Sequence, residues 1–274
     1  MIRLDLQTFG GDGKSMLRQS VSIVTIVKDH AAGLSNTYKS TANQNFSDWE
    51  MLVVVGDSSD STLATAQEIK SNDARVQVIE QNGLGIYTAM NQGIEKARTD
   101  LIWFMNAGDE FADATALDVG VQAILNTNVG LVIGGYKIAD EGNHRVFSFT
   151  SKPISTLDFA FTRRGGCHQA MIFRTELLRD LGGFTSNFRI ANDFELVLKV
   201  IERAGAIRVR DVFAKVEPGG IADQGILLVH REKNQIRKLF FKNFGINLLS
   251  LTWTLMASSK IIMRQTLNRV KNLR

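Results

Sequence analysis

The feature that most limits the possible folds is an alternation of short apolar runs with helix-like segments in the first half of the chain. Four runs rich in β-branched and other apolar residues lie at 21–27, 49–55, 76–79 and 101–105. Runs this short, separated by segments with helical spacing, are typical of strands that are buried on both faces of a parallel sheet. The pattern therefore predicts a doubly wound α/β half.

The second half of the chain is less regular. We expect a loop at 158–166. We expect helices at 116–125, 175–181 and 190–204, and strands at 129–137, 146–150, 168–173 and 207–216. A hydrophobic content of 44% and a charged content of 22% predict a packed globular core.

The ends of the chain differ from the rest. Residues 1–19 lack the apolar core of a signal peptide, because Gly10, Gly11 and Gly13 interrupt them, and we interpret them as a flexible leader. The single cysteine, Cys167, cannot form an internal disulfide or a cysteine-rich zinc site, which indicates a reducing, cytoplasmic setting.

The C-terminal tail is strongly basic. Residues 226–274 hold ten Lys and Arg against one acid, a net charge of +9, whereas the rest of the chain carries −5. Residues 243–259 carry no charge but fall short of the ~20 apolar residues that a spanning helix needs. Two interpretations stay open: an amphipathic helix on an anionic inner leaflet, or a C-terminal helix packed on the body with a solvated basic face. We expect no nucleic-acid partner.

Two predicted strands end in polar clusters. The strand at 101–105 leads into Asn106, Ala107, Gly108 and Asp109. Ligands of open α/β sheets bind beyond the carboxyl ends of the strands, and a carboxylate there can hold a divalent cation that in turn binds a diphosphate. Taken alone, this stretch is equally well interpreted as a polar turn whose Asp caps the next helix.

Four blocks, in order, give the chain a family resemblance over residues 20–225. They are the strand at 21–27 with the Val-rich strand that ends at Val55, the G-I-Y-T-A-M-N-Q-G block at 85–93, the F-M-N-A-G-D block at 104–109, and His168-Gln169-Ala170 together with N-D-F-E at 192–195. Together these blocks resemble family 2 glycosyltransferases with the GT-A fold, and most of all the colanic-acid type that builds bacterial surface polysaccharide.

The resemblance implies an architecture. It implies an α/β GT-A fold with a mixed central sheet, a Rossmann-like nucleotide-sugar half at 20–111, an acceptor half at 112–225 and a helical, basic extension at 226–274. It also implies an inverting transferase that moves a sugar from a nucleotide-diphospho-sugar to a saccharide acceptor, either free or lipid-linked. The location would be cytoplasmic, or peripheral at the inner face of the membrane.

The resemblance also assigns roles to residues. Asp109 matches the last acid of the family's metal motif and would bind Mn²⁺ or Mg²⁺, and Asp193 matches the general base. The residues implied at the nucleotide-sugar are Thr25, Val27, Asp57, Tyr87, Asn91 and Asn106. Those implied on the acceptor side are Arg163, Arg164, His168, Gln169 and Glu195.

Some positions depart from the family pattern. Lys28 and Asp29 stand where an aromatic residue and Asn are usual, and Asp57 comes one residue later than the family's base-binding acid. The identity of the nucleotide base therefore stays open. Two alternatives remain, namely a nucleotidyltransferase and a degenerate GT-A domain that only binds sugars or partners. Asp193 as a helix-capping acid and His168 as a core histidine are the corresponding structural interpretations.

Overall fold

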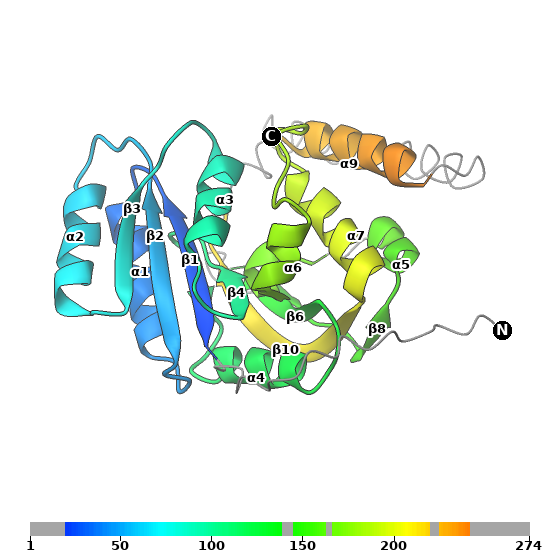
Figure 1. Ribbon diagram of the computed structural model, residues 1–274, viewed down its shortest axis with the longest axis horizontal. Helices are drawn as coiled ribbons and strands as arrows, with labels where there is room; N and C mark the ends of the chain where they lie inside the picture. The colour runs from blue at the N-terminus through cyan, green and yellow to red at the C-terminus, as the bar shows by residue number, and fades with distance from the viewer. Residues whose placement is uncertain (1–19, 139–144, 163–165, 220–224, 242–274) are drawn as a thin grey trace, which may run out of the picture.

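The computed structural model describes residues 20–138, 145–162, 166–219 and 225–241 (Figure 1). The strands are β1 (Val21–Val27), β2 (Trp49–Val55), β3 (Val76–Glu80), β4 (Leu101–Phe104), β5 (Glu110–Phe111), β6 (Leu131–Ile138), β7 (Arg145–Phe147), β8 (Lys152–Ile154), β9 (Met171–Arg174) and β10 (Ala206–Val216). The helices are α1 (Ala31–Ala42), α2 (Thr62–Asn72), α3 (Ile86–Lys96), α4 (Ala116–Leu125), α5 (Thr156–Phe161), the 3₁₀ helix η1 (His168–Ala170), α6 (Thr175–Asp180), α7 (Asn192–Ala204) and α9 (Ile226–Phe240).

One mixed sheet runs through the described part of the chain. Its order is β3-β2-β1-β4-β9-β6-β10-β5, with β7 paired to β6 and β8 paired to β10. Strands β1 to β4 are parallel to one another, whereas β9 runs antiparallel to both β4 and β6. The predicted mixed α/β sheet is confirmed. The prediction that β4 sits in a parallel sheet holds on its β1 side and is wrong on its β9 side.

Two apolar clusters cover the two faces of the sheet. On one face Phe104 packs with residues of α3, α6 and α7, and on the other Trp103 packs with residues of α1, α2 and α4. Figure 1 shows α3, α6 and α7 on the near side of the sheet. Successive side chains of a strand point to opposite faces, so a strand covered on both sides must be apolar throughout. This explains why the central runs carry no polar alternation.

The segment predicted as a loop at 158–166 starts differently in the structure. Helix α5 begins at Thr156, and Ser155 closes its first turn by accepting from the Asp158 N–H (3.0 Å) while its own N–H donates to Asp158 Oδ2 (3.2 Å). This reciprocal pair is a capping box, formed here by Asp in place of the usual Glu. The strand predicted from His168 likewise begins three residues late, because η1 occupies the first three positions.

The first part of the basic tail packs on the body. Helix α9 lies beside α7, and its Glu232, Ile236 and Arg237 are buried. Within the described ranges, none of the helices combines the length and apolarity needed to cross a bilayer. The leader at 1–19 and the charge-free stretch at 243–259 lie outside the described residues, so the predictions for both stay predictions.

Candidate active site

The turn after β4 carries Asp109 and is fixed by α1. The hydroxyl of Thr37 donates to the Asp109 carbonyl oxygen (2.7 Å) and accepts from the Gly108 N–H (3.0 Å). Gly108 has a φ of 97°, which an L side chain rarely adopts, so glycine is required at the tip of the turn. The turn therefore places the Asp109 carboxylate at the carboxyl end of the sheet, as the sequence predicts.

The Asp109 side chain is only 5% exposed and is held from two sides. Its Oδ2 accepts from Gln169 Nε2 (2.7 Å), and its Oδ1 accepts from the backbone N–H of Glu217 (2.9 Å). Burial raises the pKa of Asp109, and the hydrogen bonds from Glu217 and Gln169 only partly offset that rise. The carboxylate is thus costly as an anion here and gains from a neighbouring cation.

The residues around Asp109 fit a divalent cation that a diphosphate helps to hold. Asn106 Oδ1 is buried and accepts no hydrogen bond from the described residues, which leaves a free oxygen close to the same turn. Among those residues no group of three or more His, Cys, Asp or Glu could hold a metal by itself. Mg²⁺ is commonly bound by one or two carboxylates plus substrate phosphates, so a single acid with an amide oxygen is a suitable protein share.

Asp193 lies at the start of α7 and faces His168. Its side chain is 33% exposed, so a small hydroxyl group has access to it, and its Oδ2 lies 3.8 Å from His168 Nδ1. Asn106 Nδ2 lies 3.1 Å from His168 Nε2. An amide nitrogen can only donate, so Nε2 accepts and the ring proton sits on Nδ1, toward Asp193.

The electrostatic surroundings keep Asp193 ionised. Burial raises the pKa of Asp193, but the His168 side chain and the positive charge of Lys233 outweigh burial, and the pKa falls below its usual range. An ionised carboxylate at neutral pH can accept a proton, which is the requirement for a general base.

Helix η1 connects the two carboxylates. Its first residue, His168, contacts Asn106 and Asp193, and its second residue, Gln169, binds Asp109. The backbone oxygen of Gln169 in turn accepts from the buried Trp103 Nε1 (2.8 Å), which fixes η1 against the core. The structure therefore brings Asp109 and Asp193 together with two of the predicted acceptor-side residues, His168 and Gln169.

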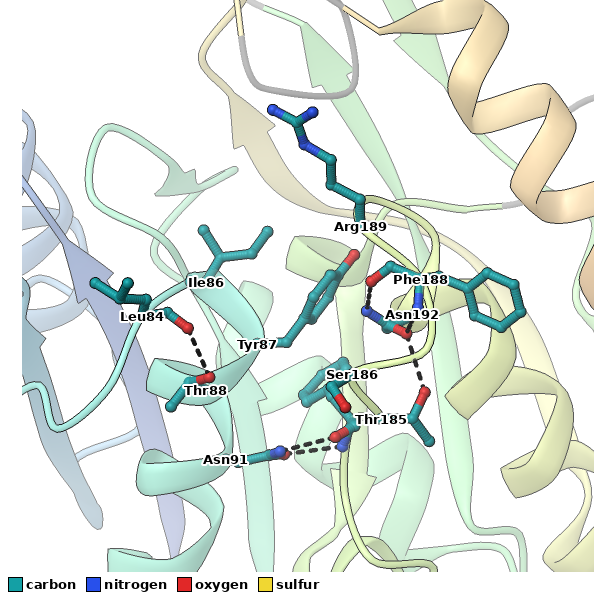
Figure 2. Close-up of a pocket in the computed structure, with 12 residues that line it drawn as sticks. Leu84, Ile86, Tyr87, Thr88, Asn91, Thr185, Ser186, Phe188, Arg189 and Asn192 are labelled. Atoms are coloured by element: carbon teal, nitrogen blue, oxygen red, sulfur yellow. Dashed lines mark hydrogen bonds between the residues drawn. The ribbon is translucent and has the colours of Figure 1, made fainter.

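A cleft of about 200 Å³ lies between the start of α3 and the loop at 184–192, and Asn192, the residue before Asp193, lines it. Figure 2 shows Tyr87 and Asn91 of α3 facing this loop. The Tyr87 hydroxyl donates to the Ile190 carbonyl, and the Asn91 side chain exchanges two hydrogen bonds with the backbone of Phe184. Both residues line the cleft. Through these hydrogen bonds they also hold the loop at 184–192, which forms the opposite wall.

The structure places other predicted site residues on β1, after β2 and on α7. Thr25 and Val27 are buried in β1, whereas Asp57 is exposed after β2. Glu195 Oε1 pairs with Lys199 (3.0 Å), and its Oε2 accepts from the hydroxyl of Thr185 (2.6 Å), which lines the cleft. The predicted acceptor-side pair of arginines lies outside the described residues.

Several residues were given no role in the site from the sequence. Asp29, with a φ of 49°, accepts from the Ser59 N–H (2.6 Å) and so ties the ends of β1 and β2 together. His30 Nε2 lies 2.9 Å from Glu217 Oε2, beside Gly108. The rule that strand ends meet at one edge could have pointed to Glu217, because it directly follows the last strand.

The comparisons with known proteins identify the family of the chain. Residues 22–182 match the family model described as glycosyl transferase family 2, which is more than half of the chain. The chain belongs to that family. It is 28% identical over 222 residues to an uncharacterized glycosyltransferase of Mycobacterium tuberculosis, an alignment that covers 79% of this chain and 80% of the relative.

Two further similarities extend this picture. The chain is 27% identical over 183 residues to the PGL/p-HBAD biosynthesis glycosyltransferase of Mycobacterium bovis, covering 65% of this chain and 68% of the relative. Its fold resembles the mannosyltransferase PcManGT from Pyrobaculum calidifontis, solved with GDP-Man and Mn²⁺, with a TM-score of 0.64 at 16% identity over 92% of this chain and 79% of that one. The predicted GT-A fold is thereby confirmed.

Proposed function

We propose that this chain is an inverting glycosyltransferase that moves a sugar from a nucleotide-diphospho-sugar to a saccharide acceptor. The observation that carries the proposal is the link through η1, in which Gln169 binds Asp109 and His168 faces Asp193. One carboxylate is suited to a cation and the other to a proton. They lie at one edge of the sheet, beside a cleft, which is where ligands of α/β sheets bind.

The reaction needs one base and no protein nucleophile. The acceptor oxygen attacks the anomeric carbon while the bond from that carbon to the diphosphate breaks, and the electron pair leaves with the nucleoside diphosphate. The hydroxyl proton passes to the Asp193 carboxylate, which the neighbouring Lys233 and His168 keep ionised beforehand. Attack from the face opposite the leaving group inverts the anomeric configuration.

Asp109 and Asn106 would hold the cation, Mn²⁺ or Mg²⁺. When bound, such an ion neutralises charge that develops on the leaving diphosphate. The protein's own part is to present the Asp109 carboxylate in a fixed orientation, which the hydrogen bonds from Gln169 and Glu217 achieve. A relative of similar fold was solved with Mn²⁺ and GDP-Man, which supports a metal and a nucleotide-sugar for this chain too.

We further propose an acceptor in surface glycan assembly, carried on a lipid. The name of the Mycobacterium bovis relative, a PGL/p-HBAD biosynthesis glycosyltransferase, supports this class. The outer face of α9 combines the exposed Leu227 and Leu239 with the exposed Arg231 and Lys238, which suits contact with an anionic leaflet. The enzyme would then work in the cytoplasm, at the inner face of the membrane.

The test begins with a thermal-shift screen of UDP-, GDP-, CDP- and dTDP-sugars with Mn²⁺. The donor with the largest shift is then incubated with a panel of alkyl glycosides, and the release of nucleoside diphosphate is measured. We expect Asp193→Asn to lower kcat by about 10²- to 10⁴-fold with the donor Kd unchanged. We expect Asp109→Asn to abolish the Mn²⁺-dependent part of donor binding.

Matched controls are Asp118→Asn and Asp180→Asn, each a helical Asp away from the site. Both should turn over like the wild type. Wild-type turnover in Asp193→Asn would reject the base, and Mn²⁺-dependent binding retained in Asp109→Asn would reject the cation site. Donor binding without any transfer by the wild type would favour a binding module instead.

A further inference from the structure

The inner face of α9 carries charged side chains toward the segment that leads into the proposed base. Glu232 is 6% exposed and Arg237 is 3% exposed, although both are charged. Arg237 Nε donates to the Ala160 carbonyl of α5 (2.8 Å), and Lys233 Nζ lies 5.1 Å from the centre of the Phe194 ring. Buried charges are rare in proteins unless they are paired or hydrogen-bonded, so each calls for a partner.

Glu232 finds its partners in three successive backbone N–H groups. Its Oε1 accepts from Arg189 (2.9 Å), and its Oε2 accepts from Ile190 (2.9 Å) and Ala191 (3.0 Å). Ala191 is the N-cap of α7 and offers no side-chain cap of its own. The carboxylate thus accepts, from more than forty residues away, from the N-cap N–H itself, which an N3 side chain usually binds in a capping box, and from the two N–H groups before it.

The same segment is fastened at two other points. The Tyr87 hydroxyl donates to the Ile190 carbonyl, and the Phe188 N–H donates to Asn192 Oδ1 (3.2 Å). Asp193 follows Asn192 directly, and its Oδ2 lies 3.8 Å from His168 Nδ1. The position of the Asp193 carboxylate therefore depends on how this backbone is held.

We infer that Glu232 is a positioning residue for transfer, because its carboxylate clamps residues 189–191 and so sets where Asp193 stands at the acceptor. The inference rests on the proposed role of Asp193 as the base. It gives α9, which lies beyond the residues that match the family model, an indirect part in the reaction, through the backbone that leads into Asp193. Lys233 adds charge beside Asp193, whereas Glu232 acts through the backbone.

This role makes a prediction that general stabilisation does not. Asp109 is held by Gln169, by the Glu217 N–H and by the turn on Thr37, and none of these contacts involves α9. Loss of the clamp should therefore slow transfer and leave cation-dependent nucleotide binding intact. A displacement of about 1 Å at a catalytic group can cost roughly 10²-fold in rate.

The first experiment compares Glu232→Gln with Gln235→Glu in the full chain. The two changes exchange the same pair of side chains on one helix, but Gln235 is exposed and serves as the control. Gln at 232 keeps the volume and has only one oxygen, so at least one of the three N–H groups loses its acceptor. Hydrogen exchange of the amides at 189–191 should accelerate about tenfold or more in Glu232→Gln and stay unchanged in Gln235→Glu, at matched melting temperatures.

The second experiment measures transfer. We expect Glu232→Gln to lower kcat by about 10- to 100-fold, with Kd for UDP or GDP plus Mn²⁺ unchanged. In the Asp193→Asn background the same change should have no further effect on the residual rate, because a residue that acts through Asp193 has nothing left to position. If Glu232→Gln does not fold, Glu232→Asp, which keeps the charge and withdraws it by one methylene, is measured in the same way.

Several results would overturn the inference. Wild-type exchange at 189–191 together with wild-type kcat would do so, as would a double variant slowed by the full factor of Glu232→Gln alone. Equal losses in kcat and in nucleotide binding would reduce Glu232 to a stabilising residue. Wild-type turnover in Asp193→Asn is a different result, since it rejects the proposed base rather than the clamp.

Discussion

A substitution of Asn91 can test whether this side chain contacts the ligand or only holds the structure of the protein. The family resemblance places it at the nucleotide-sugar, yet its amide is occupied by the protein. Asn91 Nδ2 donates to the Phe184 carbonyl (2.8 Å), and the Phe184 N–H donates to Asn91 Oδ1 (2.8 Å). Truncation of Asn91 to Ala removes the hydrogen-bond partners of both the N–H and the carbonyl of Phe184, a residue that is only 5% exposed.

The expected cost follows from these two bonds. A buried polar group left without a partner costs about 1–3 kcal/mol, so Asn91→Ala should lose about 2–4 kcal/mol after some hydration of the opened cleft. For a domain of this size each kcal/mol lowers Tm by about 2–4 °C. We therefore expect Tm to fall by roughly 4–16 °C.

The assay is thermal unfolding monitored by calorimetry, and the control is Glu95→Ala on the same helix. Glu95 is exposed, so its truncation should change the free energy of unfolding by less than about 0.5 kcal/mol. Below the transition, Asn91→Ala should bind UDP or GDP with Mn²⁺ about as tightly as the wild type. A wild-type Tm combined with lost nucleotide binding would refute this reasoning and restore Asn91 as a ligand contact.

Two further predictions concern the turn after β4. Because burial raises the pKa of Asp109 above that of the unfolded chain, its charge destabilises the fold at neutral pH, and this penalty is relieved as pH falls through the raised value toward 3.8. Asp109→Asn removes the titration, but its single oxygen cannot replace both acceptors of Gln169 Nε2 and the Glu217 N–H, so the variant loses a hydrogen bond at every pH. In EDTA, urea unfolding should therefore show the stability of the wild type rising relative to that of Asp109→Asn between pH 7 and pH 4.5, and a relative fall would contradict the sign. Gly108→Ala should lower the free energy of unfolding by about 1–3 kcal/mol, because its φ of 97° strains an L residue. It should also weaken Mn²⁺-dependent UDP binding, since its Cβ would stand 2.0 Å from Glu217 Oε2. The control is Gly182→Ala, which has a φ of 75° and open space around it and so should show the strain alone; equal losses of UDP binding in the two variants would exclude the Glu217 contact as the cause.

The strands of the first half of the chain were predictable because the pattern that marks them lies within each strand's own sequence. Strands β1 and β2 were predicted to the residue, and β3 and β4 to within one residue. A strand buried on both faces must be apolar throughout, and a sequence displays that directly. The turn at Asp109 was also visible, because a polar cluster after an apolar run marks the end of a strand.

The second half was harder because its pairing is between distant segments. The sequence of β9 does not indicate that the strand lies between β4 and β6 and runs antiparallel to both. Strand β8 was missed since its middle residue is Pro153, which the sequence rules place outside a strand interior and the structure places beside β10.

The candidate site shows the same division. The family resemblance pointed to Asp109, His168, Gln169 and Asp193, and the structure brings these four into one cluster. It could not show what each side chain binds. Glu232 illustrates the limit: it looks like one acid in a basic tail, and its partners are backbone N–H groups that every residue possesses.

The position of β10 has a practical consequence for exchanging parts between relatives. The family match ends at residue 182, but β10 supplies the ladder partner of β5 and β8 and half of the pairing of β6. A fragment cut at that limit would expose three strand edges and the apolar surface that α7 covers, which invites aggregation. Chimaeras that exchange the second half of the chain between relatives should therefore be joined upstream of β6 and extend through α9. Strand β10 and helix α7, which carries the proposed base Asp193, then come from the same protein as β6.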